Sequence, residues 1–211
     1  MTLPKLYPIL DTATLEQRDA SLLSATRAFL QAGATLLQIR HKGHWSRDIF
    51  AESEAVAQLC REREATLVIN DRADIAMLLN AGLHIGQDDL PPQVARRLIG
   101  PDRILGFSTH NEAQLTAASQ EPVDYVAIGP IFPTRSKQNP DPTLTPAHLT
   151  RWRKLVMRPL VAIGGIDRTN ARAVIEAGAD SVAIIGDLYP DSATEQTLYE
   201  RATEWHQLLN R

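Results

Sequence analysis

The chain has 211 residues and a formal net charge of −3; 44% of its residues are hydrophobic and 22% are charged. These values are typical of an ordinary globular protein and predict a single domain over residues 1–211, while the negative charge gives no support to a nucleic-acid partner. One cysteine, Cys60, excludes an internal disulfide. No signal peptide and no apolar run near the roughly 18 residues of a membrane helix are visible, so we expect a cytoplasmic protein without a membrane partner.

Short apolar runs alternate with longer amphipathic segments along the whole chain. The runs typical of β-strands are residues 6–10, 36–42, 66–70, 83–86, 104–108, 125–129, 160–163 and 181–185. The segments with helical spacing are residues 15–31, 46–63, 73–80, 93–98, 111–119, 146–155, 169–176 and 195–209. This alternation predicts parallel βα units, and roughly 26 residues per unit predict a compact single-domain TIM (β/α)8 barrel. The competing fold, a doubly wound open sheet, usually has fewer strands and a glycine-rich first turn.

The second predicted strand carries polar side chains along one face. Because side chains alternate along a strand, Gln38, Arg40 and Lys42 point to one face, whereas Ile39 and His41 point to the other. An antiparallel strand with one solvated face would also explain this pattern. In a barrel, the same face predicts a polyphosphate site, because Arg binds phosphate bidentately and Lys binds it as a point charge.

Two acids follow the third and fourth predicted strands. The active site of a TIM barrel lies at the carboxyl ends of the strands, so Asp71 and Asp89 are expected at the same rim. Two carboxylates beside cationic side chains favour Mg²⁺, whose ligands are carboxylate and substrate phosphate oxygens. Each aspartate could instead be the N-cap of the helix that follows it.

Glycines follow the last two predicted strands, at Gly164-Gly165 and Gly186. This is the position of the recurrent phosphate pocket of TIM barrels, where backbone N–H groups bind the anion. A simple turn would also use these glycines. Together with the face that carries Arg40 and Lys42, a second anion pocket implies two phosphorylated small-molecule substrates.

Six motifs carry a resemblance to a known family. In chain order they are QIRHK (38–42), INDR (69–72), HIGQDD (84–89), GFSTH (106–110), GPIFPTRSK (129–137) and AIGGI (162–166). These motifs and their order resemble the thiamine-phosphate synthase family, also called thiamine-phosphate pyrophosphorylase. The resemblance extends from residue 6 to residue 188, and the combination of motifs makes it highly specific.

The resemblance implies a TIM-barrel transferase that joins two precursors into thiamine phosphate and releases pyrophosphate. The precursors are 4-amino-2-methyl-5-hydroxymethylpyrimidine diphosphate and 4-methyl-5-(2-hydroxyethyl)thiazole phosphate, called the pyrimidine diphosphate and the thiazole phosphate below. For the pyrimidine diphosphate the resemblance implies Gln38, Ile39, Arg40, His41, Lys42, Asn70, Ser108 and Lys137. For the thiazole phosphate it implies Thr134, Arg135, Ser136, Gly165, Ile185 and Gly186. It also implies Mg²⁺ as the cofactor, bound by Asp71 and Asp89.

General chemistry agrees with this activity. Diphosphate is a good leaving group only if its developing charge is neutralised, which Mg²⁺ and the catalytic cations Arg40, Lys42 and Lys137 can do. An electron-rich aminopyrimidine stabilises a methylene cation, so we expect a dissociative displacement in which the thiazole nitrogen attacks. Positioning and electrostatics carry such a reaction, and no residue is assigned a covalent role.

Two departures from the family pattern bear on the thiazole phosphate. Ser136 stands where the family usually has threonine and keeps the hydroxyl group. Gly186-Asp187 stands where the family usually has a serine after the apolar pair. The missing hydroxyl and the negative charge of Asp187 predict weaker binding of the thiazole phosphate.

Two other functions stay open from the sequence. A thiazole tautomerase-like paralogue would share the barrel, but that family lacks the acid pair of Asp71 and Asp89. A non-catalytic phosphate-ligand binder would be consistent with the change at Gly186-Asp187. The sequence allows a homo-oligomer and does not specify one.

Overall fold

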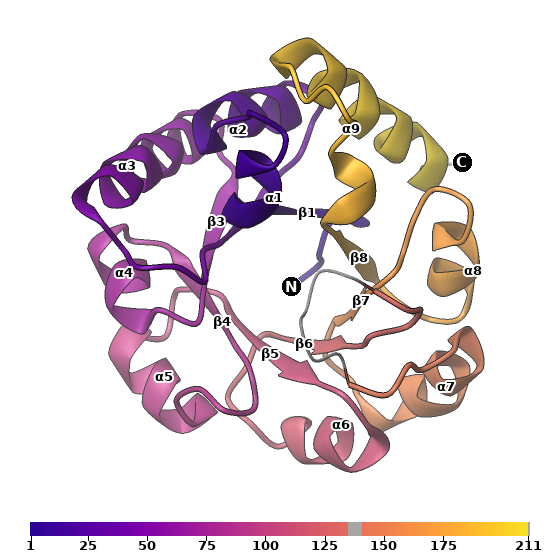
Figure 1. Cartoon of the computed structure of the whole chain (residues 1–211). Helices are drawn as coiled ribbons and strands as arrows, with labels where there is room; N and C mark the ends of the chain where they lie inside the picture. The colour runs from indigo at the N-terminus through magenta and orange to yellow at the C-terminus, as the bar shows by residue number, and fades with distance from the viewer. Residues whose placement is uncertain (135–140, 211) are drawn as a thin grey trace.

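The computed structural model describes residues 1–134 and 141–210 (Figure 1). Within these ranges the strands pair in parallel in the order of the sequence, and β8 pairs with β1 to close a barrel. The strands are β1 (Leu6–Asp11), β2 (Leu36–Arg40), β3 (Thr66–Asn70), β4 (Gly82–Ile85), β5 (Leu105–Thr109), β6 (Tyr125–Ile128), β7 (Leu160–Ile163) and β8 (Ser181–Ile184). The predicted TIM (β/α)8 barrel is confirmed.

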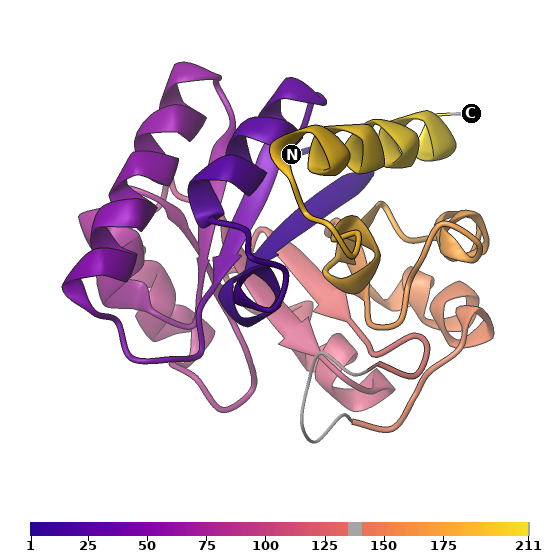
Figure 2. The ribbon, with the colours of Figure 1, turned by 45° about the horizontal axis from the view of Figure 1, so that its top comes forward.

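A ring of helices surrounds the barrel (Figure 1). The α-helices are α1 (Thr12–Glu16), α2 (Leu22–Gln31), α3 (Arg47–Glu62), α4 (Ala73–Leu78), α5 (Pro92–Ile99), α6 (Glu112–Ala118), α7 (Pro146–Trp152), α8 (Ala171–Glu176) and α9 (Glu195–Leu209). The described residues also form the short 3-10 helices η1 (Arg153–Leu155) and η2 (Gly186–Leu188). The last helix, α9, packs against α2, so segments from both ends of the chain complete the ring (Figure 2). Across residues 1–134 and 141–210, no helix combines the length and the apolar character needed to span a membrane.

Most strand residues are apolar on both faces, as expected for a parallel sheet covered by helices. Every residue of β1 is buried. Tyr7 and Ile9 face the barrel interior, so by alternation Leu6 and Leu10 face the helices. Polar residues follow at the carboxyl end, beginning with Asp11 in β1. The packed strand bodies therefore form a rigid base that fixes where these polar side chains lie.

The segment 15–31, predicted as one helix, forms two helices, so this prediction was wrong. Helix α1 ends at Glu16, and the chain then passes through Asp19 in a left-handed conformation with a φ of 51°. Ser21 begins α2 as its N-cap and forms a capping box with Ser24. The apolar spacing continues through the break, so only the capping serine signals it in the sequence.

Candidate active site

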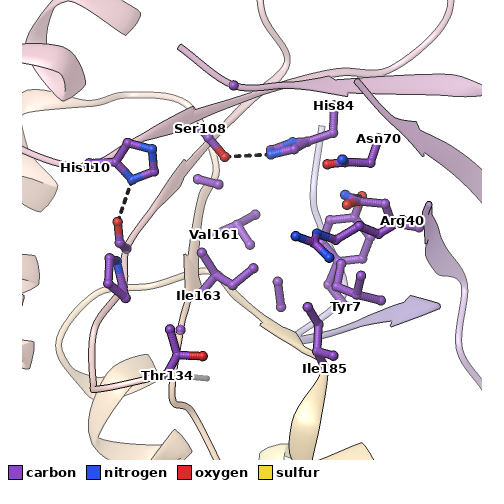
Figure 3. A pocket seen from close by; sticks show the side chains of 18 of the residues that line it. Tyr7, Arg40, Asn70, His84, Ser108, His110, Thr134, Val161, Ile163 and Ile185 are labelled. Carbon is purple, nitrogen blue, oxygen red and sulfur yellow. Dashed lines mark hydrogen bonds between the residues drawn. The ribbon is translucent and has the colours of Figure 1, made fainter. Parts of the chain in front are cut away.

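A cavity of about 510 Å³ opens at the carboxyl ends of the strands (Figure 3). Its wall has two halves. The polar half comes from β2 to β5 and includes Gln38, Arg40, Lys42, Asn70, Asp71, His84, Asp89 and Ser108. The apolar half comes from the region of β6 to β8 and includes Ala127, Gly129, Val161, Ile163, Gly164, Gly165, Ala183, Ile185 and Gly186. One half therefore suits a charged ligand, and the other suits an apolar ring next to exposed main chain.

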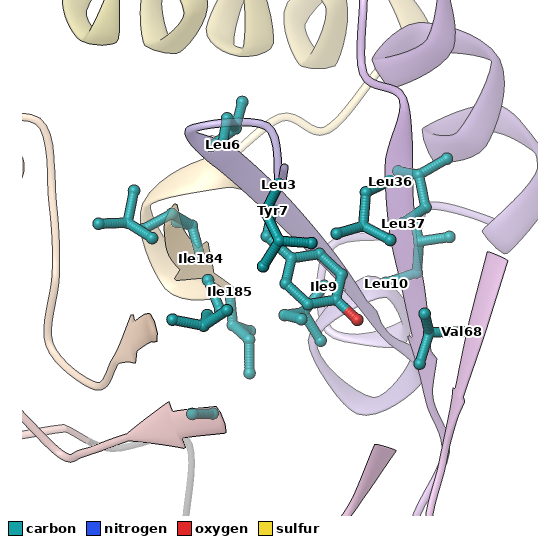
Figure 4. Packing of buried hydrophobic residues seen from close by; sticks show 14 of the residues in the cluster. Leu3, Leu6, Tyr7, Ile9, Leu10, Leu36, Leu37, Val68, Ile184 and Ile185 are labelled. Atoms are coloured by element: carbon teal, nitrogen blue, oxygen red, sulfur yellow. The ribbon is translucent and has the colours of Figure 1, made fainter. Parts of the chain in front are cut away.

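The floor of the cavity is built from side chains of the strand bodies. Tyr7 and Ile9 extend from β1 into the barrel on the side of Ile185 (Figure 4). The ring of Tyr7 meets the ring of Tyr125 edge to face, with the ring centroids 6.0 Å apart. Both tyrosines are fully buried, so the floor excludes water below the polar groups.

The structure brings most of the predicted site residues to this cavity. Its wall includes Gln38, Arg40, Lys42, Asn70, Asp71, Asp89, Ser108, Thr134, Gly165, Ile185 and Gly186. Two other residues that the resemblance implies, Ile39 and His41, do not line the cavity. Ile39 is buried on the opposite face of β2, and His41 contacts Thr12 and Trp45. Alternation along the strand explains this placement. Three further predicted residues lie outside the described part of the chain: Arg135, Ser136 and Lys137.

The two cations of the second strand segment pair with carboxylates of neighbouring strands. Arg40 donates from Nη1 to Asp11, and Lys42 donates from Nζ to Asp71. Asp11 is 4% exposed and also accepts a hydrogen bond from the backbone N–H of Thr14 at 2.9 Å. The buried pair fixes the direction of the guanidinium, which keeps further N–H donors for a ligand. Asp11 was missed from the sequence, although it ends a strand as the other acids do.

Asp71 and Asp89 both line the cavity, and the negative charge of Asp71 acts on the carboxyl group of Asp89. Asp71 has a left-handed backbone with a φ of 64°, and Asp89 accepts a hydrogen bond from the Gly86 backbone N–H at 2.7 Å. Neither is the N-cap of the following helix, since these positions are held by Arg72 and Pro91. Burial raises the pKa of the Asp89 carboxyl above its ordinary value, and the negative charge of Asp71 raises this pKa as well, against the opposing effect of the Gly86 N–H.

This pair of carboxylates fits a hard divalent cation. Within residues 1–134 and 141–210, no group of three or more His, Cys, Asp and Glu side chains is placed to hold a metal. Zn²⁺ usually needs three or four protein ligands of this kind. Mg²⁺ instead uses one or two carboxylates, and water and substrate phosphate oxygens complete its coordination. The side chains of Asp71 and Asp89 therefore suit Mg²⁺.

Asn70 presents a donor that the protein leaves unpaired. Asn70 is the last residue of β3; it lines the cavity and is 7% exposed. In the described part of the chain, its buried Nδ2 atom has no hydrogen-bond partner. A buried donor without a partner costs about 1–3 kcal/mol, so this group indicates that a ligand atom accepts its hydrogen bond.

Five side chains from five strands form a continuous hydrogen-bonded chain, which we call the side-chain relay. Gln38 Nε2 donates to Tyr7 Oη at 2.9 Å, and Tyr7 Oη lies 3.1 Å from Tyr125 Oη. Nδ1 of His84 lies 2.9 Å from Oη of Tyr125. Nε2 of the same ring lies 2.8 Å from Oγ of Ser108 (Figure 3). Burial raises the pKa of both tyrosines and lowers the pKa of His84 to about 4. The relay is therefore uncharged at neutral pH.

The depressed pKa of His84 predicts that acid destabilises the fold. In the unfolded chain a histidine has a pKa near 6.5, so between pH 6.5 and 4 the unfolded state binds a proton that the folded state does not. The contribution of the neutral His84 to the free energy of unfolding is therefore at its maximum above about pH 6.5. It falls as the pH decreases towards 4, by about 2 kcal/mol between pH 7 and 5. Urea unfolding at both pH values measures this loss. His84→Gln should reduce the loss, and an equal loss in both proteins would contradict the assignment to His84.

The ends of β7 and β8 present main chain to the apolar half. Gly164 and Gly165 have φ values of 97° and 64°. A Cβ atom at Gly165 would lie 2.5 Å from the carbonyl oxygen of Pro133 and 2.7 Å from Cβ of Phe132. Gly186 begins η2, where a Cβ atom would meet nothing within 4 Å. These turns have the exposed main chain that a phosphate pocket needs.

Asp187 points away from the cavity. Its carboxylate accepts a hydrogen bond from Arg168 Nε at 2.9 Å, and Nη1 of Arg201 lies 3.9 Å from its other oxygen. Arg201 belongs to α9, so the negative charge is neutralised against the outer helices. The expected effect of this charge on the second phosphate pocket is not supported, and only the missing hydroxyl at Gly186 remains.

Known proteins of one family match this chain over almost its whole length. A family model described as thiamine monophosphate synthase matches residues 6–188. Thiamine-phosphate synthase from Koribacter versatilis is 45% identical over 213 residues, which cover 100% of this chain and 98% of that protein. The enzyme of the same name from Chlorobium phaeovibrioides is 44% identical, over 87% of this chain and 89% of that protein. The structure of thiamine phosphate pyrophosphorylase from Pyrococcus furiosus matches with a TM-score of 0.83 and 29% identity, over 98% of this chain and 95% of that chain. The chain belongs to the thiamine monophosphate synthase family.

Proposed function

We propose that the protein is a transferase that joins the pyrimidine diphosphate to the thiazole phosphate and releases pyrophosphate. The observation that carries this proposal is the division of the cavity into two halves. The cations and acids of the polar half suit a diphosphate, and the glycine main chain of the apolar half suits a single phosphate beside an apolar ring. Membership of the family supports the same reaction.

Asp71 and Asp89 would hold Mg²⁺, which when bound would neutralise part of the charge on the leaving pyrophosphate. The placement of both side chains in the wall of the cavity supports this assignment. Arg40 and Lys42 would neutralise the rest, and Asp11 keeps the guanidinium of Arg40 in place. We assign the same role to one further cation outside the described residues, Lys137.

The pyrimidine ring would bind to Gln38, Asn70 and Ser108. It would accept a hydrogen bond from Nδ2 of Asn70, which has no partner among the described residues. The bond between the methylene carbon and the diphosphate oxygen breaks, and its electron pair leaves with pyrophosphate. The thiazole nitrogen then donates its lone pair to the methylene cation and forms the new C–N bond. No protein nucleophile is needed, and Cys60 does not line the cavity; burial raises the pKa of its thiol to about 12.

The thiazole phosphate would occupy the apolar half of the cavity, beside the residues that would bind the pyrimidine and its methylene cation. The proposal assigns it Thr134, Arg135, Ser136, Gly165, Ile185 and Gly186. Main-chain N–H groups at the two glycines would bind the phosphate, and Ile185 would pack against the ring. Because this half is apolar, it would keep water away from the methylene cation. Water would otherwise react with this cation in place of the thiazole nitrogen.

A hydroxyl group at position 186 should strengthen binding of the thiazole phosphate. Gly186→Ser fits without strain, because a Cβ atom there meets nothing within 4 Å. A hydrogen bond to a charged phosphate contributes about 1.5 kcal/mol, so we expect the KM for the thiazole phosphate to fall roughly tenfold. Gly186→Ala is the control, since it adds the carbon without the hydroxyl. Equal KM values for the two variants would contradict the assignment.

The proposed function is tested by incubating the purified protein with both precursors and MgCl₂. We expect equal amounts of thiamine phosphate and pyrophosphate by chromatography, and neither product when one precursor is omitted. A rearranged thiazole without pyrophosphate would indicate the tautomerase-like function instead. Binding of both precursors without turnover would indicate a non-catalytic binder, and either result would overturn the proposal.

The setting of the reaction also stays a proposal. Charged substrates do not cross a lipid bilayer unaided, which supports the cytoplasm as the compartment. The expected absence of a nucleic-acid partner remains a prediction from the sequence, which allows a homo-oligomer without specifying one.

A further inference from the structure

The side-chain relay crosses the barrel interior, yet its three inner members have no part in the reaction as proposed above. Tyr7, His84 and Tyr125 are 1%, 8% and 0% exposed. A glycine makes room for them, because a Cβ atom at Gly106 would lie 2.1 Å from Cζ of Tyr125 and 2.5 Å from Nδ1 of His84. The imidazole also stacks on the Tyr125 ring, at an interplanar angle of 15°. Such close packing holds the three side chains in one arrangement.

The protons of the relay run in one direction once its first donor is fixed. Nε2 of Gln38 can only donate, so Tyr7 accepts this bond; Tyr125 is its other hydrogen-bond partner among the described residues, and we therefore infer that the buried Tyr7 hydroxyl donates to Tyr125. Tyr125 then donates to Nδ1 of His84. A neutral imidazole that accepts at Nδ1 carries its proton at Nε2, and donates this proton to Oγ of Ser108.

The surroundings of His84 keep its imidazole neutral. Both ring nitrogens contact hydroxyl groups, and no carboxylate accepts a hydrogen bond from the ring among the described residues. Burial is the main cause of its lowered pKa, and the charges of Asp71 and Lys42 act on this pKa in opposite directions. A buried imidazolium without a carboxylate partner would be costly. The ring therefore offers one donor and one acceptor.

Each end of the relay meets the cavity with a defined polarity. Because Ser108 accepts from His84, its own hydroxyl proton is free to be donated to a ligand in the cavity. At the other end, Gln38 uses Nε2 within the relay and keeps Oε1 as an acceptor. A ring with an acceptor nitrogen and a donor amino group matches these two ends, as an aminopyrimidine does.

We propose that Tyr7, Tyr125 and His84 are positioning residues that hold Ser108 as a hydrogen-bond donor and Gln38 as an acceptor, so that the cavity selects the hydrogen-bonding edge of an aminopyrimidine. The inference rests on the proposed function, because it takes the pyrimidine diphosphate as the ligand. It adds residues that act through Gln38 and Ser108, without touching the reacting atoms. It also assigns the tautomer of His84, which can be measured without any substrate.

The first test is the tautomer of His84 in the whole protein, measured by ¹⁵N NMR with labelled histidine. The signal of His84 is identified by its absence from the spectrum of His84→Gln. We expect a protonated Nε2 and a bare Nδ1 in the wild type, and a mixture of tautomers in Tyr125→Phe, which removes the donor to Nδ1. Protonation at Nδ1 in the wild type would mean that the relay runs in the opposite order, and would overturn the proposal.

The second test compares two tyrosine variants in steady-state kinetics. Tyr125→Phe keeps the ring and removes the relay hydroxyl, and we expect kcat/KM for the pyrimidine diphosphate to fall about tenfold while the KM for the thiazole phosphate stays unchanged. Tyr189→Phe is the matched control. It also removes a buried hydroxyl, which donates to the Ile9 carbonyl oxygen at 2.7 Å outside the relay.

The two tests separate the possible outcomes. The proposal would be overturned if both tyrosine variants lost kcat/KM for the pyrimidine diphosphate equally, or if the KM for the thiazole phosphate changed instead. Either result would mean that the relay has only a structural role. A wild-type protein that forms no thiamine phosphate would overturn the proposed function. In that case the tautomer measurement would still decide whether the relay presents Ser108 as a donor.

Discussion

Asp71→Asn should lower kcat/KM by about 10²–10³-fold, because it removes one charge from the carboxylate pair proposed to hold Mg²⁺. The substitution keeps the shape of the side chain, but Lys42 loses its ion-pair partner and Asp89 loses its charged neighbour. We expect the Mg²⁺ concentration at half-maximal rate to rise together with the fall in kcat/KM. Chelation of divalent ions by EDTA should abolish the wild-type activity, and added Mg²⁺ should restore it.

Asp74→Asn is the matched control for this substitution. Asp74 is exposed, accepts a hydrogen bond from Arg72 Nε at 2.8 Å and does not line the cavity. Its replacement should leave the Mg²⁺ dependence unchanged. Full activity of Asp71→Asn, or an equal loss in the two variants, would rule out a metal site at the acid pair.

Gly165→Ala should be nearly as damaging, through backbone geometry rather than charge. The new Cβ atom would lie 2.5 Å from the Pro133 carbonyl oxygen and 2.7 Å from Cβ of Phe132, both parts of main-chain packing that cannot rotate away. The turn must therefore shift, and its N–H groups would no longer converge on one phosphate. We expect the KM for the thiazole phosphate to rise at least tenfold, with a loss of stability of about 1–3 kcal/mol.

Gly33→Ala separates this collision from backbone strain. Gly33 also has a positive φ, of 101°, but a Cβ atom there meets nothing within 4 Å, and the residue lies away from the cavity. This variant should lose stability and keep its KM values. If Gly33→Ala raised the KM for the thiazole phosphate as much as Gly165→Ala, the phosphate pocket at β7 would be refuted.

The sequence was sufficient for the barrel and for most of the polar residues at its strand ends, although not for Asp11. Each βα unit carries its own apolar period, and the rule that barrel sites lie at the carboxyl ends of strands then collects Arg40, Asp71 and Asp89 at one rim. Strand alternation also gave the correct faces for Ile39 and His41, where the family resemblance alone included both in the site. Local periodicity and a topological rule were therefore enough to predict much of the polar half of the cavity.

The side-chain relay could not be predicted in the same way. Tyr7 and Tyr125 lie in the apolar bodies of strands, where a tyrosine looks like any other large core residue. Their contact joins positions 118 residues apart in the chain, and its hydrogen-bond direction depends on His84 and Gln38 from two other strands. No local pattern encodes such a contact, because it arises only when the barrel closes. Gly106 is the one local trace, since a glycine inside a strand signals a close approach of other groups.

The two halves of the cavity are built by successive stretches of the chain, since β2 to β5 precede β6 to β8. Apart from Lys137, the residues proposed for bond cleavage therefore precede in the chain most of those proposed to bind the thiazole phosphate. Transplanting the loops that follow β7 and β8 from another barrel would leave the residues proposed to cleave the diphosphate bond in place, Lys137 included, and would offer the same carbocation to a different azole. The protein is in this sense a ready scaffold for engineered alkylation, in which the acceptor can be exchanged without rebuilding the step that generates the electrophile.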